Sequence, residues 1–176
     1  WPRSDLPGES GYDFAGRAAV AVEPVPQVAV EMRDGAALNV RHLDTAGAQA
    51  PLLVLAHGSG WHGQQFDALA RALGDVAEIV APDLRGHGAA PERRGDVDYI
   101  GQMEDDLADV IDAFAAPGQR VVLAGHSSGG GLVVRFAGGP HGDRIDGAIL
   151  LAPFLKYNAP TARENSGGWA RPLTRR

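Results

Sequence analysis

Short apolar runs alternate with stretches of helical periodicity through the middle of this sequence, and this alternation restricts the fold more than any other feature. Four runs have the character of strands buried on both faces, and they lie at residues 51–56, 78–81, 120–124 and 145–152. Three stretches between them repeat apolar residues at helical spacing, at 66–73, 103–114 and 132–136. This order predicts an α/β fold, with a mostly parallel sheet covered by helices on both faces.

An antiparallel hairpin is predicted before this core. Residues 28–33 and 38–43 read as strands, and the Asp34-Gly35 dipeptide between them is a strong signal for a tight turn. Residues 1–27 are rich in Pro, Gly, Arg and Ala and show little periodicity, which indicates a loosely ordered lead-in. We therefore expect the folded core to span residues 28–152.

Composition and charge exclude several classes of protein. The chain has 176 residues, enough for one domain, and its 44% hydrophobic and 22% charged residues are ordinary for a globular protein. A net charge of −6 argues against a nucleic-acid partner. No apolar run approaches the roughly 18–20 residues that span a bilayer. Cysteine is absent, which excludes a disulfide scaffold, a thiolate metal site and a cysteine nucleophile.

The chemistry is concentrated in residues 125–129, Gly-His-Ser-Ser-Gly, which fit the pattern G-x-S-x-G between a predicted strand and a predicted helix. A sharp turn there would hold the backbone of Ser127 in a strained conformation, with glycines on either side to make room. Its hydroxyl would then stand above the C-terminal edge of the sheet, beside a helix N-terminus. Ser127 is the candidate nucleophile. The alternative is a helix-capping serine in an inactive relative.

A second motif, His-Gly-Ser-Gly-Trp at residues 57–61, follows the first buried strand. Acyl transfer requires two N–H donors aimed at the developing oxyanion, one from the residue after the nucleophile and one from the loop after an earlier strand. The backbone N–H groups of Ser128 and Ser59 are the candidates. Trp61 and His62 follow this loop and are the candidate lining of the substrate pocket.

A third motif, Asp-Leu-Arg-Gly-His-Gly at residues 83–88, has no evident role in the reaction. In this order and spacing the three motifs resemble the α/β-hydrolase superfamily, in particular its lysophospholipase or monoacylglycerol-lipase-like branch of serine esterases. The resemblance covers residues 28–155. It implies an α/β-hydrolase fold whose first strand pairing is antiparallel, Ser127 as nucleophile, the amides of Ser59 and Ser128 as oxyanion hole, and a lid after the last predicted strand.

The resemblance also implies an activity. The enzyme would be a serine hydrolase that cleaves carboxylic esters, of lysophospholipid or monoacylglycerol type, through an acyl-enzyme and without a metal or organic cofactor. Its partner would be a small-molecule ester or lipid. A peptidase, a thioesterase or a perhydrolase on the same fold, and a non-catalytic binding relative, remain as alternatives. A nucleotide site is disfavoured because the sequence has no G-x-x-x-x-G-K-[ST] run.

The partners of a catalytic triad are not evident. Their order in this superfamily is Ser, then Asp or Glu, then His. His141 is the only histidine after Ser127, at a position that the family pattern places far from the nucleophile, and Glu164 is the only acid after residue 152. We therefore expect an N-terminal fragment, inactive as it stands, with the acid and the histidine beyond residue 176. Residues 153–176 would begin the lid. The protein would be cytoplasmic, or exported or membrane-anchored if an N-terminal segment was removed.

Other residues receive structural interpretations. His57 is expected to brace its loop through hydrogen bonds, and Asp83, Arg85 and His87 to tie the site region together, with contact to a polar head group as the alternative. The acidic run over residues 104–112 is interpreted as a solvated helix face. The last strand is expected to be an exposed hydrophobic edge. The candidate apolar residues of the lid are Phe154, Leu155, Tyr157 and Trp169.

Overall fold

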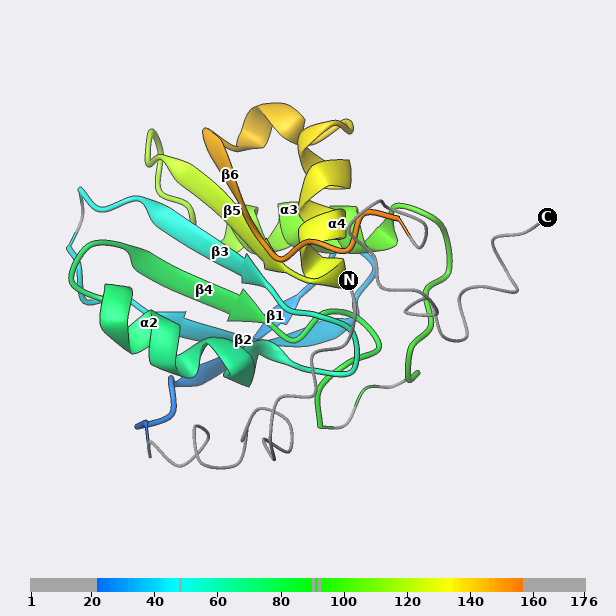
Figure 1. Cartoon of the computed structure of the whole chain (residues 1–176), viewed down its shortest axis with the longest axis horizontal. Helices are drawn as coiled ribbons and strands as arrows, with labels where there is room; N and C mark the ends of the chain where they lie inside the picture. The colour runs from blue at the N-terminus through cyan, green and yellow to red at the C-terminus, as the bar shows by residue number, and fades with distance from the viewer. Residues whose placement is uncertain (1–21, 48, 90, 92, 157–176) are drawn as a thin grey trace, which may run out of the picture.

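Six strands form one mixed sheet, with the order β1-β2-β4-β3-β5-β6, in the computed structural model of the chain, which describes residues 22–47, 49–89, 91 and 93–156 (Figure 1). The strands are β1 (Gln27–Glu31), β2 (Ala37–Leu43), β3 (Leu52–Ala56), β4 (Glu78–Pro82), β5 (Val121–His126) and β6 (Gly147–Leu151). β3 to β6 pair in parallel, whereas β2 runs antiparallel to both β1 and β4. The predicted α/β class and the predicted N-terminal hairpin are confirmed.

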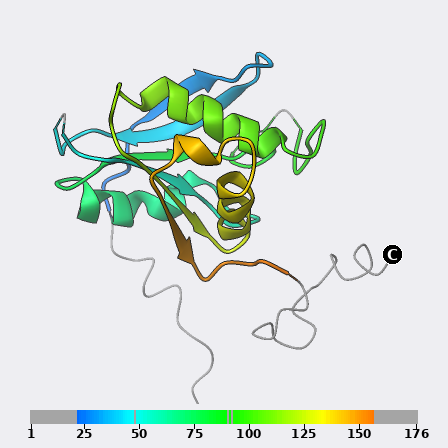
Figure 2. The same ribbon diagram turned by 90° about the horizontal axis from the view of Figure 1, so that it is seen from above.

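Helices cover both faces of this sheet. Figures 1 and 2 show α2 (Asp67–Leu73) on one face and α3 (Gln102–Phe114) on the other. The 3₁₀ turn η1 (Gly63–Phe66) precedes α2, while α4 (Ser128–Ala137) and the 3₁₀ turn η2 (Gly142–Arg144) follow β5. No helix in the described ranges is both long enough and apolar enough to cross a membrane.

The core is divided by the side-chain alternation of β3. Leu52 and Val54 pack with the apolar residues of α3 and α4 into one cluster, and Leu53 and Leu55 pack with Phe66 and Ala70 of the α2 side into another. Successive residues of a strand point to opposite faces, so a run that is apolar throughout can supply both clusters. This is why the sequence of β3 lacks the polar alternation of a half-exposed strand.

Two boundaries differ from those expected from the sequence. The folded part begins before residue 28, since Val25 is 3% exposed and the Pro26 carbonyl accepts a hydrogen bond from the His42 N–H at 3.0 Å. Proline lacks an N–H donor, but its carbonyl can still pair along a strand. The last strand is shorter than predicted and covers only Gly147–Leu151. Tyr157 and Trp169, predicted for the lid, lie outside the described residues.

The interpretation of residues 104–112 as a solvated acidic face is wrong for Asp106, which is only 3% exposed. Its carboxylate accepts hydrogen bonds from Arg85. The same helix also receives Arg33 from the turn of the hairpin, whose guanidinium binds the carboxylate of Asp109 at 2.7 Å. Cations from two distant loops therefore bind α3, and helical periodicity within α3 cannot reveal them.

Candidate active site

The four parallel strands end at the same edge of the sheet, so the loops that follow β3, β4, β5 and β6 meet there. Ser127 stands at this edge between β5 and α4, with φ 54° and ψ −119°. A non-glycine residue with positive φ in such a region carries a strain of about 1–3 kcal/mol, which the surroundings must offset. The Ser127 N–H donates to the Leu151 carbonyl at 3.1 Å, and the Ser127 carbonyl accepts from Phe154 N–H at 2.7 Å. The chain leaving β6 thus holds the elbow in place.

The glycines of the G-x-S-x-G pattern are required by close backbone approach. A Cβ on Gly125 would lie 2.3 Å from the carbonyl oxygen of Gly129, and a Cβ on Gly129 would lie 2.2 Å from the carbonyl oxygen of Ala56. Neither distance is possible for a real side chain. The sequence pattern is therefore a direct consequence of how tightly α4 returns over β5 and β3.

The loop after β3 reaches the elbow through Gly58. A Cβ built on Gly58 would lie 3.2 Å from the Cβ of Ser127. His57, fully buried, accepts the Leu84 N–H at its Nε2 at 2.9 Å and donates from Nδ1 to the Gly58 carbonyl at 2.8 Å. Burial lowers the pKa of His57 to about 4, which keeps the ring neutral at physiological pH. The predicted bracing role of His57 is confirmed.

Ser59 and Ser128 lie in direct contact. The Ser59 backbone N–H donates to the Ser128 hydroxyl oxygen at 2.7 Å, and the Ser59 hydroxyl donates to the same oxygen at 2.8 Å. Ser128 is also the first residue of α4, and the first N–H groups of a helix have no partner within it. The structure therefore brings together Ser127, Ser59 and Ser128, the three residues that carry the chemistry predicted from the sequence.

The loop after β4 is held by buried ion pairs. Asp83 binds the Arg41 guanidinium at 2.9 Å and accepts the Gly63 N–H at 2.8 Å. His87 packs edge-on against the ring of His57, with the ring centroids 5.1 Å apart. These contacts agree with the predicted tying role of the loop.

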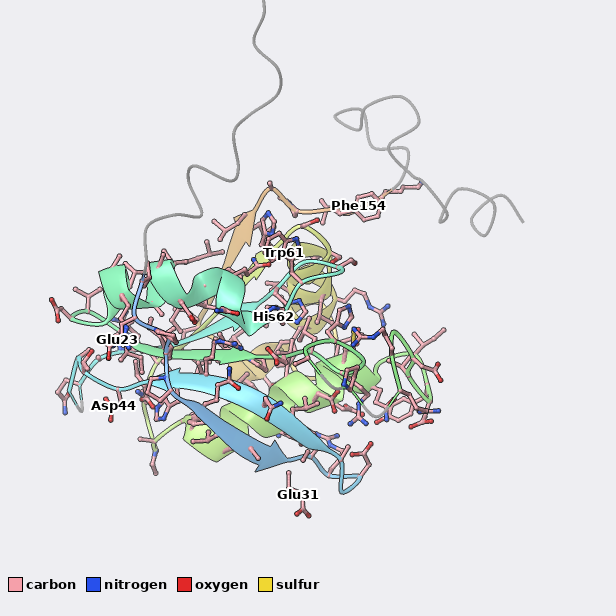
Figure 3. The ribbon with its side chains drawn as sticks, turned by 90° about the horizontal axis from the view of Figure 1, so that it is seen from below. Glu23, Glu31, Asp44, Trp61, His62 and Phe154 are labelled. Atoms are coloured by element: carbon pink, nitrogen blue, oxygen red, sulfur yellow. The ribbon has the colours of Figure 1, made fainter. Side chains whose placement is uncertain are left out.

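Trp61 and His62, the predicted pocket residues, lie outside the groove that opens beside the elbow. Trp61 is 60% exposed and His62 is partly buried, and Figure 3 shows Trp61 below Phe154 and His62 lower still, near the centre of the view. Neither lines the apolar groove of about 510 Å³ that opens beside Ser128. Among the residues that do line this groove are Val97, Tyr99, Ile100, Leu132, Phe154 and Leu155.

Three of these groove residues, Val97, Tyr99 and Ile100, were missed by sequence reasoning. Their signal is weak but present, because Tyr99 and Ile100 are adjacent large side chains in a loop before α3 that is rich in charged residues and glycine. Ile100 is 88% exposed, which is unusual for an isoleucine without a partner surface.

His141, the only histidine that follows Ser127 in the sequence, is not placed to serve as its general base. His141 follows the C-terminal end of α4, whereas Ser127 precedes its N-terminal end, and ten helical residues span about 15 Å. His141 donates from Nε2 to Asp105 at 2.6 Å and stacks on Phe136. His126 packs with its Nδ1 against Gly58 and has no hydrogen-bond partner for that atom among the described residues. In the same residues no group of three or more His, Asp or Glu side chains could hold a metal ion.

A strained serine at a strand-to-helix elbow, on a parallel sheet that begins with an antiparallel pairing, defines the α/β-hydrolase class. Residues 47–175 match the family model Hydrolase_4, described as "Serine aminopeptidase, S33", and the chain belongs to this family. The resemblance read from the three sequence motifs is confirmed at this level.

Relatives of known name support the same branch. Monoglyceride lipase from Homo sapiens is 30% identical over 132 residues, which cover 73% of this chain and 43% of the lipase. Esterase PIR7B from Oryza sativa subsp. japonica is 40% identical over 101 residues, covering 56% of this chain and 35% of the esterase. A solved structure of a thermophilic esterase from Thermogutta terrifontis (malate bound) is 29% identical with a TM-score of 0.60, covering 80% of this chain and 50% of that one. The chain spans half or less of the length of these relatives.

Proposed function

We propose that the full-length protein carrying this chain is a serine hydrolase that cleaves carboxylic esters through an acyl-enzyme, with Ser127 as the nucleophile. The observation that carries the proposal is the elbow itself. Ser127 has φ 54° and is clamped between the carbonyl of Leu151 and the amide of Phe154. Strain of this kind persists only where the surroundings enforce it, and it is concentrated at functional sites.

In the proposed mechanism, the Ser127 hydroxyl attacks the ester carbonyl and the carbonyl oxygen takes up the negative charge. The backbone N–H groups of Ser59 and Ser128 stabilise that oxyanion. Collapse of the tetrahedral species expels the alcohol and leaves the acyl group on Ser127, and water then releases the acid. The contact between Ser59 and Ser128 supports this assignment, because the Ser59 N–H points at the first residue of α4, which directly follows Ser127.

The base that deprotonates Ser127 and the acid that orients the base are proposed to lie in the part of the full-length protein that follows this chain. Two observations support this. The relatives are at least twice as long as the segments that match, and the superfamily places both partners after the serine. A serine hydroxyl is a weak nucleophile without such a base, so residues 1–176 alone are expected to be inactive.

The proposed substrates are lipid-like monoacyl esters, of the lysophospholipid or monoacylglycerol kind. The apolar groove beside Ser128 has a volume of about 510 Å³, within the usual range of ligand pockets, and one relative bears the name monoglyceride lipase. Trp61 and His62, in the loop after β3, remain candidate pocket residues although they do not line this groove. Neither a metal nor an organic cofactor takes part in the proposed reaction.

A peptidase is the second candidate, because the matching family is described as a serine aminopeptidase. Attack on an amide uses the same nucleophile and oxyanion hole, so the described residues do not separate the two reactions. Thioesterase and perhydrolase activity are further possibilities on the same fold. A panel of nitrophenyl esters of increasing chain length, acyl-thioesters and aminoacyl amides separates these activities by their kcat/KM values.

The central test uses a fluorophosphonate probe, which reacts with activated serines. The full-length protein is expected to label at Ser127, as located by peptide mass spectrometry, and Ser127→Ala is expected to abolish labelling. Thr45→Ala is a matched control, because it removes a hydroxyl that binds the Gly74 carbonyl at the opposite edge of the sheet. A folded full-length protein that does not label would instead favour a non-catalytic binding relative.

A further inference from the structure

Ser59 directs two separate donors at a single oxygen atom. Its backbone N–H lies 2.7 Å and its hydroxyl 2.8 Å from the Ser128 Oγ. Donors of an oxyanion hole converge on one oxygen at about 2.7–3.1 Å in the same way. The Ser128 hydroxyl oxygen therefore occupies a position that is already built to receive an acceptor oxygen.

The fold does not require this pair of hydroxyls. The elbow depends on Gly125 and Gly129, and the loop depends on Gly58 and on the buried His57. The turn after Gly58 closes through its carbonyl and the Trp61 N–H at 3.2 Å, without a side chain of Ser59. Ser59 is exposed, so an alanine there would fit equally well. The two hydroxyls are therefore not needed to form the elbow or the loop, and a role in the active site is open to them.

We propose that the Ser59 hydroxyl is a third donor to the oxyanion, beside the amides of Ser59 and Ser128, and that the Ser128 hydroxyl fills this position until the substrate carbonyl oxygen displaces it. The inference rests on the proposed function. The Ser59 O–H keeps its proton throughout and forms no covalent bond, since it only donates a hydrogen bond. The displaced Ser128 hydroxyl turns to water, because the contact lies at the surface.

The energetic reason is the difference in charge between the two acceptors. A neutral hydroxyl and a ground-state carbonyl oxygen accept hydrogen bonds of similar strength, so exchanging one for the other changes substrate binding little. Hydrogen bonds to an ionised oxygen are roughly twice as strong as neutral ones. An interaction that strengthens only in the transition state raises kcat and leaves KM almost unchanged.

Steady-state kinetics of the full-length protein on a nitrophenyl ester test the third donor. Ser59→Ala keeps the amide and removes the hydroxyl, and it is expected to lower kcat by about 10²-fold, the low end of what losing one oxyanion donor costs, with KM nearly unchanged. Ser59→Thr keeps a hydroxyl and is expected to retain most of the activity. Thr45→Ala, the remote hydroxyl deletion, is expected to leave both parameters unchanged.

A double variant separates this role from a structural one. If Ser59 acts on the oxyanion directly, Ser59→Ala lowers kcat by the same factor in a Ser128→Ala background. If the Ser59 hydroxyl only anchors Ser128, Ser59→Ala has no further effect in that background, and the inference is overturned.

Binding of an inhibitor tests the role of the Ser128 hydroxyl. Ser128→Ala is expected to bind a boronate transition-state analogue more tightly, because the Ser128 hydroxyl no longer fills the oxyanion position. Weaker binding would contradict the role given to the Ser128 hydroxyl.

Fluorophosphonate labelling of the unsubstituted protein distinguishes the two levels of proposal. If that protein neither labels at Ser127 nor turns over any ester, thioester or amide, both the proposed function and the third donor fall. If it labels and turns over but Ser59→Ala keeps full kcat, only the third donor is rejected.

Discussion

Arg85 donates two parallel hydrogen bonds to the carboxylate of Asp106, from Nε at 2.8 Å and from Nη2 at 2.6 Å. The pair joins the loop after β4 to the middle of α3. Arg85 also binds Asp34 in the hairpin turn at 2.9 Å, so one guanidinium connects three segments that are distant in the sequence. Burial raises the pKa of the Asp106 carboxyl, and the hydrogen bonds from Arg85 oppose that shift. The Arg85 guanidinium thus favours the charged form of Asp106.

Arg85→Ala is expected to lower the free energy of unfolding by about 3 kcal/mol, because it leaves a buried carboxylate without its cation. Glu23→Gln is the matched control, since the Glu23 carboxylate meets Arg71 at 3.6 Å with 83% of its side chain exposed. A surface pair of this kind contributes at most about 1 kcal/mol. Urea denaturation of the full-length protein measures both. Equal effects of the two substitutions would show that the buried pair has no special weight.

The parts of the site that local sequence determines were predictable. The glycines at 125 and 129 and the serine between them follow from a steric requirement within five residues, so the pattern itself carries the geometry of the elbow. The continuous apolar runs of β3 and β5 likewise predict that both faces of these strands are buried.

The parts that depend on pairs of distant loops were not predictable. The hydroxyls of Ser59 and Ser128 are 69 residues apart in the sequence, and their contact depends on two side-chain rotamers. Asp106 lies at the flank of the apolar stripe of α3, at helical spacing from Met103 and Val110, and its partner Arg85 arrives from another element. Helical periodicity predicts which side of a helix packs on the sheet, but it does not predict which side chains of a distant loop contact the helix.

The stability of the full-length protein is expected to fall as the pH drops from about 6.5 to about 4, in part through His57. Burial lowers the folded-state pKa of His57 to about 4. Between pH 6.5 and pH 4 this histidine is therefore protonated in the unfolded chain but not in the folded protein. The contribution is complete above pH 6.5 and its loss approaches about 3 kcal/mol near pH 4. His57→Gln, which does not titrate, is expected to flatten the pH dependence of urea denaturation in this range. An NMR titration of the folded protein that places the His57 pKa near 6.5 would refute the argument.

Gly129→Ala is expected to lower the melting temperature and to reduce fluorophosphonate labelling at Ser127. The added Cβ would lie 2.2 Å from the Ala56 carbonyl oxygen, so either β3 or the N-terminus of α4 must shift, and the elbow shifts with it. Gly138→Ala, at the other end of α4, is the matched control, because its Cβ would meet only the Val134 carbonyl at 3.4 Å. Thermal denaturation and labelling are followed on both variants. Wild-type labelling by Gly129→Ala would show that the elbow tolerates the shift.

Residues 1–176, expressed alone, are expected to self-associate through β6. Among the residues that the structure describes, this strand pairs with β5 on one side only, and Ile149 is 45% and Leu150 42% exposed along it. An unpaired hydrophobic edge offers both backbone hydrogen bonds and apolar surface to a second copy. Leu150→Lys places a charge on this edge and is expected to reduce association in analytical ultracentrifugation. Val76→Lys, at a residue 63% exposed before β4, is expected to change it little. A monomer that unfolds cooperatively without any substitution would mean that the β6 edge is already protected.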